Sequence, residues 1–396
     1  MKHYKQIYHF TYLNVYFRIF APNNTHIMYD IAVIGAGIAG IEAATQLAQM
    51  GYEVLIVERG EQAGGHVAKW DRLFPFQRNA ANLTADILKT MERGKPVKIL
   101  ANTTVADVQR DGQFFRIWLS DGQGVTVSAV LLATGFKLFD ANRKEEYGYG
   151  IYDNVITSAE LEQMFASGKP VVTRKGERPQ RIAFIHCVGS RDEKVNNRHC
   201  SKVCCATAVK QACEIKQMYP DAEVYCFYMD LRMFDRHFES MYLEAQMQYG
   251  VIFVRGRLSE AAESIDGRIT IKAEDTLMGK MLKMSVDMIV LMTGMEAADG
   301  TSRLAGMLKI ATGKDGFLNP ADEYLQGNLT REKGVFVAGA CTGPKTIPET
   351  MADARAAATL IDEYLRNNSE PKNLREEIIS MIKNRRKSTR SENTFV

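Results

Sequence analysis

The chain of 396 residues lacks any apolar run of the roughly 18 residues that a membrane-spanning helix needs. Its formal net charge of +3 is small for this length, so it has no basic footprint of the kind that binds nucleic acid. It also lacks a Cys-x-x-Cys pair, the usual arrangement of two redox-active thiols. What remains is an ordinary globular composition, 46% hydrophobic and 24% charged, in a chain long enough to fill two hydrophobic cores.

Four of the seven cysteines crowd into one short segment, at Cys187, Cys200, Cys204 and Cys205. A disulfide framework is disfavoured, because the adjacent Cys204 and Cys205 could pair only through a strained ring and the other three cysteines are scattered. Buried cysteines that act as small hydrophobic residues are a second alternative. The spacing favours a metal or cluster site. Four thiolates suit both tetrahedral zinc and a [4Fe–4S] cluster, so the sulfur count leaves the occupant open.

A dinucleotide-binding fingerprint lies near the start of the globular pattern. A short apolar strand leads directly into Gly35, Gly37 and Gly40, at the spacing G-x-G-x-x-G, and a helical segment follows. We expect Gly35 to make the turn, Gly37 to let the backbone approach a pyrophosphate, and Gly40 to let the helix pack on the strand. The next strand ends in Glu58, which is placed to accept hydrogen bonds from a ribose diol.

Later segments add residues of the same kind of site, namely Gly64, Gly65, His66, Ala133, Thr134, Gly135, Gly339, Ala340 and Pro348. These segments resemble the FAD-contacting strand ends and loops of flavoproteins with two dinucleotide-binding domains, of the thioredoxin and glutathione reductase type. The resemblance covers residues 29–366 and implies FAD as the cofactor. It also implies an α/β fold in which the FAD domain is split by an inserted Rossmann-like domain.

This resemblance divides the chain into parts. We expect the FAD-binding domain over 28–150 and 291–366, and the inserted domain over 151–290. The aromatic segment 1–27 contains no acidic residue and is predicted to be an N-terminal extension, most simply from a start codon assigned too far upstream. A membrane-surface or targeting segment is the alternative. The basic segment 367–396 is predicted to be a solvated tail.

The last predicted helix covers 348–366 and has Pro348 in its first turn, so that its positive N-terminal end would face the flavin pyrimidine. One departure from the resemblance lies just before it. Relatives of the thioredoxin reductase type carry an aspartate after the glycine of this motif, whereas this chain has Ala340 and Cys341 after Gly339. The contacts to the ribityl chain are therefore expected to differ.

The inserted domain lacks the second glycine-rich loop that would bind a nicotinamide nucleotide. Its first strand is expected over 181–186, but the loop that follows holds Cys187 and a single glycine, Gly189. A helix over 201–218 and a strand over 222–228 complete a β-α-β unit, so the fold is kept while thiolates stand where a pyrophosphate would bind. Because zinc does no redox chemistry and the flavin still needs an electron route, iron is favoured over zinc.

Segments 64–70, 187–192, 200–205 and 343–349 carry a more specific resemblance. Together they are similar to the FAD-binding A subunits of heterodisulfide reductases and to their shorter bacterial homologues, which include the FAD subunit of the quinone-interacting membrane-bound oxidoreductase. The resemblance implies that the four crowded cysteines hold one [4Fe–4S] cluster beside the flavin. It further implies that the chain passes electrons between flavin, cluster and partner subunits, which are cysteine-rich and iron–sulfur proteins.

The same resemblance places Lys210 and Lys345 near the flavin ring, where a cation would favour the reduced anion. The alternative for each lysine is an exposed helix or loop charge. Two other functions stay open: a self-sufficient NAD(P)H-dependent disulfide reductase with a structural metal, and a non-catalytic assembly module that holds FAD. Cysteines that are all compatible with reduced thiols or cluster ligation fit a cytoplasmic location, with any membrane association through partners.

Overall fold

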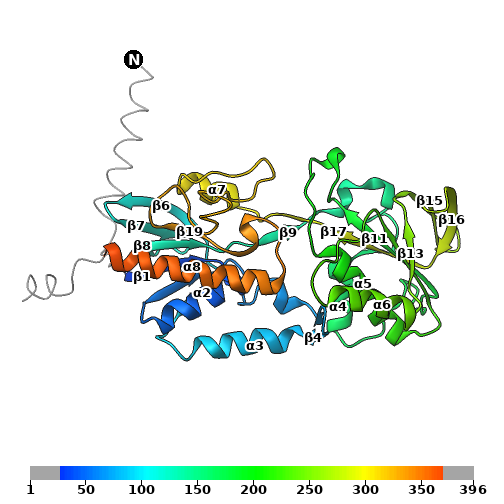
Figure 1. The fold of residues 1–396 in the computed structure, drawn as a ribbon, viewed down its shortest axis with the longest axis horizontal. Helices are drawn as coiled ribbons and strands as arrows, with labels where there is room; N and C mark the ends of the chain where they lie inside the picture. Colours follow the sequence, from blue (N-terminus) through cyan, green and yellow to red (C-terminus); the bar gives the residue numbers. More distant parts are fainter. Residues whose placement is uncertain (1–26, 369–396) are drawn as a thin grey trace, which may run out of the picture.

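The computed structural model describes residues 27–368, so the predicted N-terminal extension, apart from Ile27, and nearly all of the predicted basic tail lie outside the described residues. The described part forms two lobes side by side (Figure 1). None of its helices is long and apolar enough to cross a membrane.

The first lobe is built on a seven-stranded sheet with the order β5-β2-β1-β8-β7-β6, in which β19 also pairs with β8. Strands β5, β2, β1, β8 and β19 are parallel, while β7 and β6 continue the sheet as an antiparallel meander. The strands are β1 (Ile27–Ile34), β2 (Val54–Val57), β5 (Lys98–Leu100), β6 (Val105–Asp111), β7 (Phe114–Leu119), β8 (Gly124–Leu132) and β19 (Val335–Val337).

Helices α2 (Ile38–Gln49) and α8 (Ile347–Asn368) cover one face of this sheet, with α3 (Ala80–Met91) beyond them, and α7 (Thr301–Met307) lies on the other side (Figure 1). The two central helices approach closely because alanines fill their contact: Ala39 and Ala43 of α2 share a fully buried cluster with Ala354 and Ala358 of α8. The apolar runs of β1 and β2 are buried on both faces, as is typical of parallel strands between layers.

The second lobe holds a five-stranded parallel sheet with the order β10-β17-β11-β12-β13 and a separate three-stranded antiparallel sheet at its far end (Figure 1). Its strands are β10 (Val155–Thr157), β11 (Arg181–Val188), β12 (Glu223–Tyr228), β13 (Ile252–Arg255), β14 (Leu258–Glu263), β15 (Ile269–Asp275), β16 (Lys280–Val286) and β17 (Met288–Thr293), and its helices are α4 (Ser158–Ala166), α5 (Cys204–Met218) and α6 (Phe238–Met247). The predicted β-α-β unit is present as β11, α5 and β12.

The chain crosses between the lobes on two short antiparallel strands, β9 (Phe136–Leu138) and β18 (Met295–Ala297). These crossings differ from the boundaries of 150 and 290 expected from sequence. Phe139 and Tyr147, which precede the expected boundary, already belong to the core of the second lobe, and β17 pairs with both β10 and β11 as far as Thr293. Local sequence pattern does not distinguish the two cores, because both consist of apolar strands.

One predicted helix is shorter than expected. The helix expected from Ser201 begins at Cys204, because Lys202 adopts a left-handed conformation with φ 64° that cannot continue a helix. The following helix, α6, covers Phe238–Met247. The remaining short elements are η1 (Val67–Lys69), β3 (Arg72–Leu73), β4 (Arg78–Asn79), η2 (Ala141–Arg143), η3 (Glu145–Tyr147), η4 (Glu193–Val195) and η5 (Gly339–Thr342).

Candidate functional site

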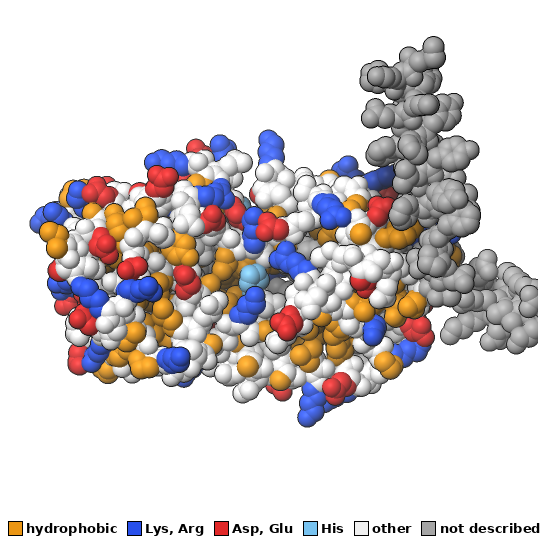
Figure 2. Space-filling view, turned by 180° about the vertical axis from the view of Figure 1, so that it is seen from behind, with side chains coloured by type: hydrophobic (Ala, Val, Ile, Leu, Met, Phe, Trp, Pro, Cys, Tyr) orange, Lys and Arg blue, Asp and Glu red, His pale blue; other side chains and the backbone are white. Residues whose placement is uncertain are grey.

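A cavity of about 790 Å³ runs between the two lobes. Its walls combine the loop after β1, the end of β2, the end of β8 and the start of α8 from the first lobe with α4 and the start of α5 from the second. In space-filling view the surface is hollowed between the lobes, and a histidine and several basic side chains gather there (Figure 2). The volume lies in the range of cofactor pockets, about 300–1,000 Å³.

The three glycines of the fingerprint have different surroundings. Gly35 has φ 110°, and an added Cβ would lie 2.5 Å from the carbonyl oxygen of Ala133. A Cβ on Gly40 would overlap the carbonyl oxygen of Gly35, so only glycine lets α2 pack this closely on β1. Gly37, in contrast, has open space where its Cβ would be, and it lines the cavity at the N-terminus of α2. A phosphate could therefore approach the backbone at Gly37.

This difference gives a prediction for two matched substitutions. We expect Gly40→Ala to lower the melting temperature, by an amount equivalent to about 1–3 kcal/mol, because the new methyl group overlaps backbone. Gly37→Ala should leave the melting temperature close to that of the wild type but weaken flavin retention, because its methyl group enters the cavity. Thermal denaturation and the flavin-to-protein absorbance ratio measure the two effects. Equal flavin retention in Gly37→Ala and wild type would contradict a role for Gly37 at the phosphates.

Glu58 lies at the end of β2 and lines the same cavity. One carboxylate oxygen accepts a hydrogen bond from the backbone of Ala36 at 2.6 Å, and the other accepts one from Gly60 at 2.7 Å. These bonds fix the carboxylate, and each oxygen keeps a further lone pair that could accept from a ribose hydroxyl.

The segment after β2 contributes Gly64, Gly65 and His66 to the cavity wall. Gly65 has φ 61° and lies against the glycine loop, since an added Cβ would be 3.0 Å from the Cα of Gly37. The ring of His66 stacks on Phe136 with centroids 4.3 Å apart, and its Nε2 is 2.9 Å from the carbonyl oxygen of Phe136. Burial lowers the pKa of His66. The neighbouring wall is formed by the end of β8, with Ala133, Thr134 and Gly135.

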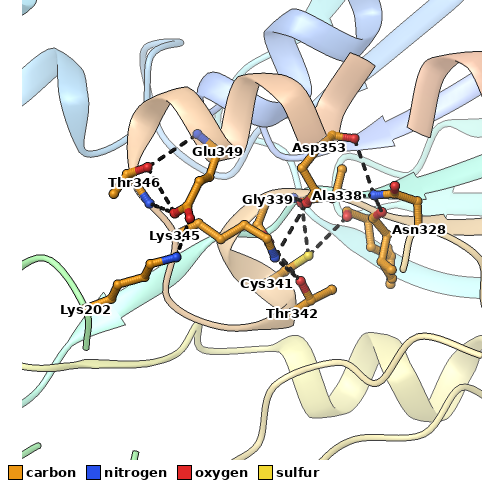
Figure 3. Close-up of polar contacts among 12 residues, drawn as sticks. Lys202, Asn328, Ala338, Gly339, Cys341, Thr342, Lys345, Thr346, Glu349 and Asp353 are labelled. Atoms are coloured by element: carbon orange, nitrogen blue, oxygen red, sulfur yellow. Dashed lines mark hydrogen bonds and ion pairs between the residues drawn. The ribbon is translucent and has the colours of Figure 1, made fainter. Parts of the chain in front are cut away.

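The loop before α8 places Lys345 at the cavity (Figure 3). Its ammonium donates to the carbonyl oxygen of Gly339 at 3.1 Å and to the hydroxyl of Thr342, and it lies 3.5 Å from the carboxylate of Asp353. Asp353 in turn accepts from the backbone N–H of Gly339 at 2.7 Å. Lys345 is therefore a half-buried, anchored cation and not a freely exposed loop charge.

Next to this lysine, Ala340 lines the cavity and Cys341 is fully buried behind it. The Cys341 thiol donates towards the carbonyl oxygens of Ala338 at 3.2 Å and Leu132 at 3.3 Å (Figure 3). Burial raises its pKa to about 11, so it is a neutral thiol at physiological pH. Cys341 thus serves packing beneath the loop, whereas Ala340, the residue directly after Gly339, faces the cavity.

Helix α8 begins with a capping box formed by Thr346 and Glu349 (Figure 3). The Glu349 carboxylate accepts from the backbone of Thr346 at 2.8 Å, and the Thr346 hydroxyl accepts from the backbone of Glu349 at 3.3 Å. Pro348 lies in the first turn, as expected, and Thr346, Ile347 and Pro348 line the cavity. Glu349 also forms an ion pair with Lys202, which joins the start of α8 to the loop before α5.

Three of the four crowded cysteines meet where β11 ends and α5 begins. Cys187 is near the end of β11 with φ 58°, and Cys204 and Cys205 form the first two residues of α5. The three thiols lie close enough to change one another's pKa. These interactions lower the pKa of Cys187 to about 7 and that of Cys205 to about 4, while the pKa of Cys204 is raised. Cys204 also lines the cavity.

The fourth cysteine, Cys200, is half-buried in the loop before α5, and its sulfur accepts from the backbone of Lys202 at 3.3 Å. Arg191 lies near both Cys200 and Cys187. The pKa of its guanidinium is raised, most strongly by a hydrogen bond to Asp230 and further by the charges of Cys187 and Cys200. One guanidinium nitrogen of Arg191, Nη1, is buried without a hydrogen-bond partner among the described residues. A buried donor beside thiolates fits a site that accepts an additional anionic group.

Within residues 27–368, no three or more His, Cys, Asp or Glu side chains are arranged to hold a metal ion as they stand. That finding concerns direct ligation of an ion. A [4Fe–4S] cube is itself several atoms wide, so its thiolate ligands surround a larger volume. The donor set, four sulfurs with a basic residue, suits such a cluster.

Lys210 is one of the most buried side chains of the molecule, with 2% exposure, so the alternative of an exposed helix charge is wrong. Its ammonium pairs with Glu162 of α4 and lies 3.0 Å from Glu214 on its own helix. It also donates to the carbonyl oxygen of Arg72 at 3.1 Å. Lys210 and Glu162 both line the cavity.

A family model described as "Pyridine nucleotide-disulphide oxidoreductase" matches residues 29–172 and 204–358. The chain belongs to this family. As a member of the pyridine nucleotide-disulphide oxidoreductases it is an FAD-dependent oxidoreductase. The match is interrupted between 172 and 204, the segment that carries Cys187 and Cys200, and resumes at Cys204.

Curated relatives carry names that are narrower than this family description. The chain is 32% identical to the A subunit of the H(2)/formate:CoB-CoM heterodisulfide,ferredoxin reductase of Methanococcus maripaludis, over 83% of this chain and 63% of that protein. It is also 32% identical to one of the iron–sulfur A subunits of the CoB–CoM heterodisulfide reductase of Methanopyrus kandleri, over 82% and 63%. The chain thus spans somewhat less than two thirds of the length of these relatives.

Solved structures confirm the predicted fold. Thioredoxin reductase from Lactococcus lactis aligns with a TM-score of 0.61 and 18% identity, covering 86% of this chain and 99% of that one. Thioredoxin reductase from T. acidophilum gives 0.59 and 16%, covering 86% and 99%. These flavoproteins have the two-dinucleotide-binding architecture expected from the sequence, with an FAD domain split by an insertion.

Sequence patterns alone did not reveal several residues of the site. Glu162 and Glu214 surround Lys210, Arg191 lies beside the cysteines, and Asp353 binds the loop of Lys345. Arg191 lies in the segment 187–192 of the resemblance but was not assigned a role there, and the other three belong to no short motif. Only the spacing of Lys210 and Glu214, one helical turn apart, could have indicated an ion pair on the predicted helix.

Proposed function

We propose that this chain is an electron-transfer subunit of a heterodisulfide-reductase-like complex that binds FAD and one [4Fe–4S] cluster. One observation carries the proposal. The cavity is lined by Gly35 and Gly37 of the fingerprint and by Cys204, and Cys204 lies close enough to Cys187 and Cys205 to change their pKa values. A flavin in this cavity and a cluster on these cysteines would be neighbours.

This proximity matches the chemistry of the two groups. A flavin takes up or releases electrons in pairs, whereas an iron–sulfur cluster carries them singly, so adjacent groups can convert one mode of transfer into the other. Where a pyridine-nucleotide flavoprotein would have a second glycine-rich loop after β11, this chain has Cys187 and the loop to Cys204. The electron route through the second lobe would therefore be metal-based.

The chain's own residues would share the binding of FAD. Gly37 and the N-terminus of α2 would take the phosphates, with Gly35 and Gly40 shaping that turn, and Glu58 would accept from the ribose. Near the ring, the N-terminus of α8 and the cation of Lys345 would both stabilise negative charge on the reduced flavin. Gly64, Gly65, His66, the segment Ala133 to Gly135, and Gly339 with Ala340 would enclose the rest.

The cluster ligands in this proposal are Cys187, Cys200, Cys204 and Cys205. Two further aspects follow from the names of the relatives, which describe A subunits of complexes that act on a CoB-CoM heterodisulfide. We infer that this chain also works with cysteine-rich and iron–sulfur partner subunits, and that it relays electrons without reducing the terminal acceptor itself. A cytoplasmic location, with membrane association only through partners, belongs to the same proposal.

Anaerobic purification of the whole chain tests the proposal. We expect FAD, about four irons and four sulfides per chain, and an EPR signal after dithionite reduction. One zinc without sulfide would contradict it. Addition of NADH under the same conditions tests the alternative of a self-sufficient NAD(P)H-dependent reductase. Rapid bleaching of the flavin by NADH alone would favour that alternative, whereas bleaching only by dithionite or a reduced iron–sulfur protein supports the relay.

A further inference from the structure

Glu214 is a buried carboxyl group without the contacts that usually stabilise a carboxylate. Its side chain is 6% exposed, and neither of its oxygens has a hydrogen bond within the described part of the chain. The ammonium of Lys210 lies within ion-pair distance, 3.0 Å, on one side only. An ionised carboxylate in such surroundings is unfavourable, because burial removes its hydration without replacing the lost hydrogen bonds.

The neighbouring carboxylate of Glu162, in contrast, accepts several hydrogen bonds. The Glu162 carboxylate receives the ammonium of Lys210, the side-chain amide of Gln211 at 2.8 Å and the backbone N–H of Asp71 at 3.2 Å. Each of these donors stabilises the ionised form. When the pair of carboxyl groups shares one proton, that proton therefore belongs on Glu214, while Glu162 remains the anion that faces Lys210.

The position of these groups relative to the cavity is the second observation. Lys210 and Glu162 line the cavity wall, and Glu214 lies behind them, one turn further along α5. With both carboxylates ionised, the three side chains carry a net charge of −1 beside the cavity. With one proton bound they are neutral. The protonation state of Glu214 thus sets the charge of this wall.

Other titratable groups act on Glu214 from the elements packed around it. Burial raises its pKa to about 7; among the charges, Lys210 lowers it while Glu162 from α4 and Asp71 from the segment before β3 raise it. On the side of α6, Glu244 and Glu214 both face Cys213, whose pKa burial raises to about 12. Cys213 is thus neutral near pH 7, and the charge beside the cavity is set by Glu162, Glu214 and Lys210, with Asp71 acting on Glu214 from outside this group.

We propose that Glu214 is a redox-linked proton site, which binds a proton from solvent when the flavin in the cavity is reduced. This inference rests on the proposed function, because it requires a flavin in the cavity. Two electrons from the external reductant and one proton from solvent would form the anionic reduced flavin, a second solvent proton forms an O–H bond at Glu214, and no bond of the protein breaks. The wall changes from −1 to neutral, and Lys210 is released from one of its two anionic partners, so that its charge compensates the reduced cofactor.

The flavin midpoint potential as a function of pH tests the inference, in wild type, Glu214→Gln and the control Glu244→Gln. Glutamine imitates the protonated carboxyl, so the Glu214→Gln potential should match that of wild type at acidic pH and lie above it at alkaline pH. The two curves should separate as the pH rises through about 7, the folded-state pKa. Glu244→Gln should follow wild type throughout. Parallel curves for Glu214→Gln and wild type would overturn the inference.

An infrared measurement gives a readout that does not depend on the variant's flavin. Reduction of the wild type at pH 7.5, a value about half a unit above that pKa, should increase the C=O band of a protonated buried carboxyl. A reduction-induced spectrum without this increase overturns the inference while leaving the proposed function intact. A wild type that retains no FAD after reconstitution overturns both.

Discussion

The double variant Cys204→Ser/Cys205→Ser is expected to lose its iron almost completely, from about four atoms per chain to fewer than one. Cys204 and Cys205 are the first two residues of α5, and Cys204 also lines the cavity. Without them only Cys187 and Cys200 remain, and two thiolates are too few to hold a cube. Iron and sulfide assays after anaerobic purification, with EPR of the reduced protein, measure the loss.

The matched control is Cys213→Ser/Cys226→Ser. Both of these cysteines are buried in the core of the same lobe, and burial raises the pKa of each, so they are neutral packing residues. Their replacement introduces as many buried hydroxyls into the lobe as the first variant does. The control should retain its iron. If both variants lost iron to the same extent, the loss would reflect a damaged core. If instead Cys204→Ser/Cys205→Ser kept four irons, these residues would be excluded as ligands.

Flavin content separates the two cofactor sites in the same experiment. The glycine loop and Glu58 belong to the first lobe and the substituted cysteines to the second, so the double variant should still bind FAD. Its flavin should then accept electrons from dithionite but deliver them slowly to a one-electron acceptor. The comparison therefore tests the relay and not only the presence of metal.

The parts of the molecule that sequence predicts well are those where a backbone requirement selects one residue type. Gly40 is the best example, because any side chain at this point would overlap the carbonyl oxygen of Gly35. Pro348 in the first turn of α8 and the apolar run of β1 are further examples. Such requirements act over a few residues, so they are visible in the sequence as a spacing.

The parts that could not be predicted depend on long-range assembly. Glu162 meets Lys210 only because α4 packs beside α5, and no local pattern encodes that contact. Asp353 reaches Gly339 through the packing of α8 against the loop. The start of α5 was misplaced because the left-handed conformation of Lys202 is set by the loop around it, and lysine itself has no preference for that conformation.

Lys210→Met should have the largest effect on stability, a loss of about 3–5 kcal/mol in the free energy of unfolding. The substitution leaves Glu162 and Glu214 buried, with side-chain exposures of 5% and 6%, without their common cation. Urea denaturation at pH 7.5 measures the effect. The control Lys137→Met breaks an exposed ion pair with Asp299, whose lysine is 42% exposed, and should change the free energy by less than about 1 kcal/mol.

The pH dependence of this loss identifies its cause. In the folded variant the two carboxyls should have raised pKa values, so the folded state binds more protons than the unfolded state and stability decreases as the pH rises above about 4.3. The stability deficit of Lys210→Met relative to wild type should therefore shrink between pH 7.5 and pH 5, while the Lys137→Met difference stays small.

Adding Glu162→Gln and Glu214→Gln to Lys210→Met removes both unpaired charges and should restore most of the stability. A deficit that is independent of pH, and unrelieved in the triple variant, would mean that Lys210 contributes mainly by filling space.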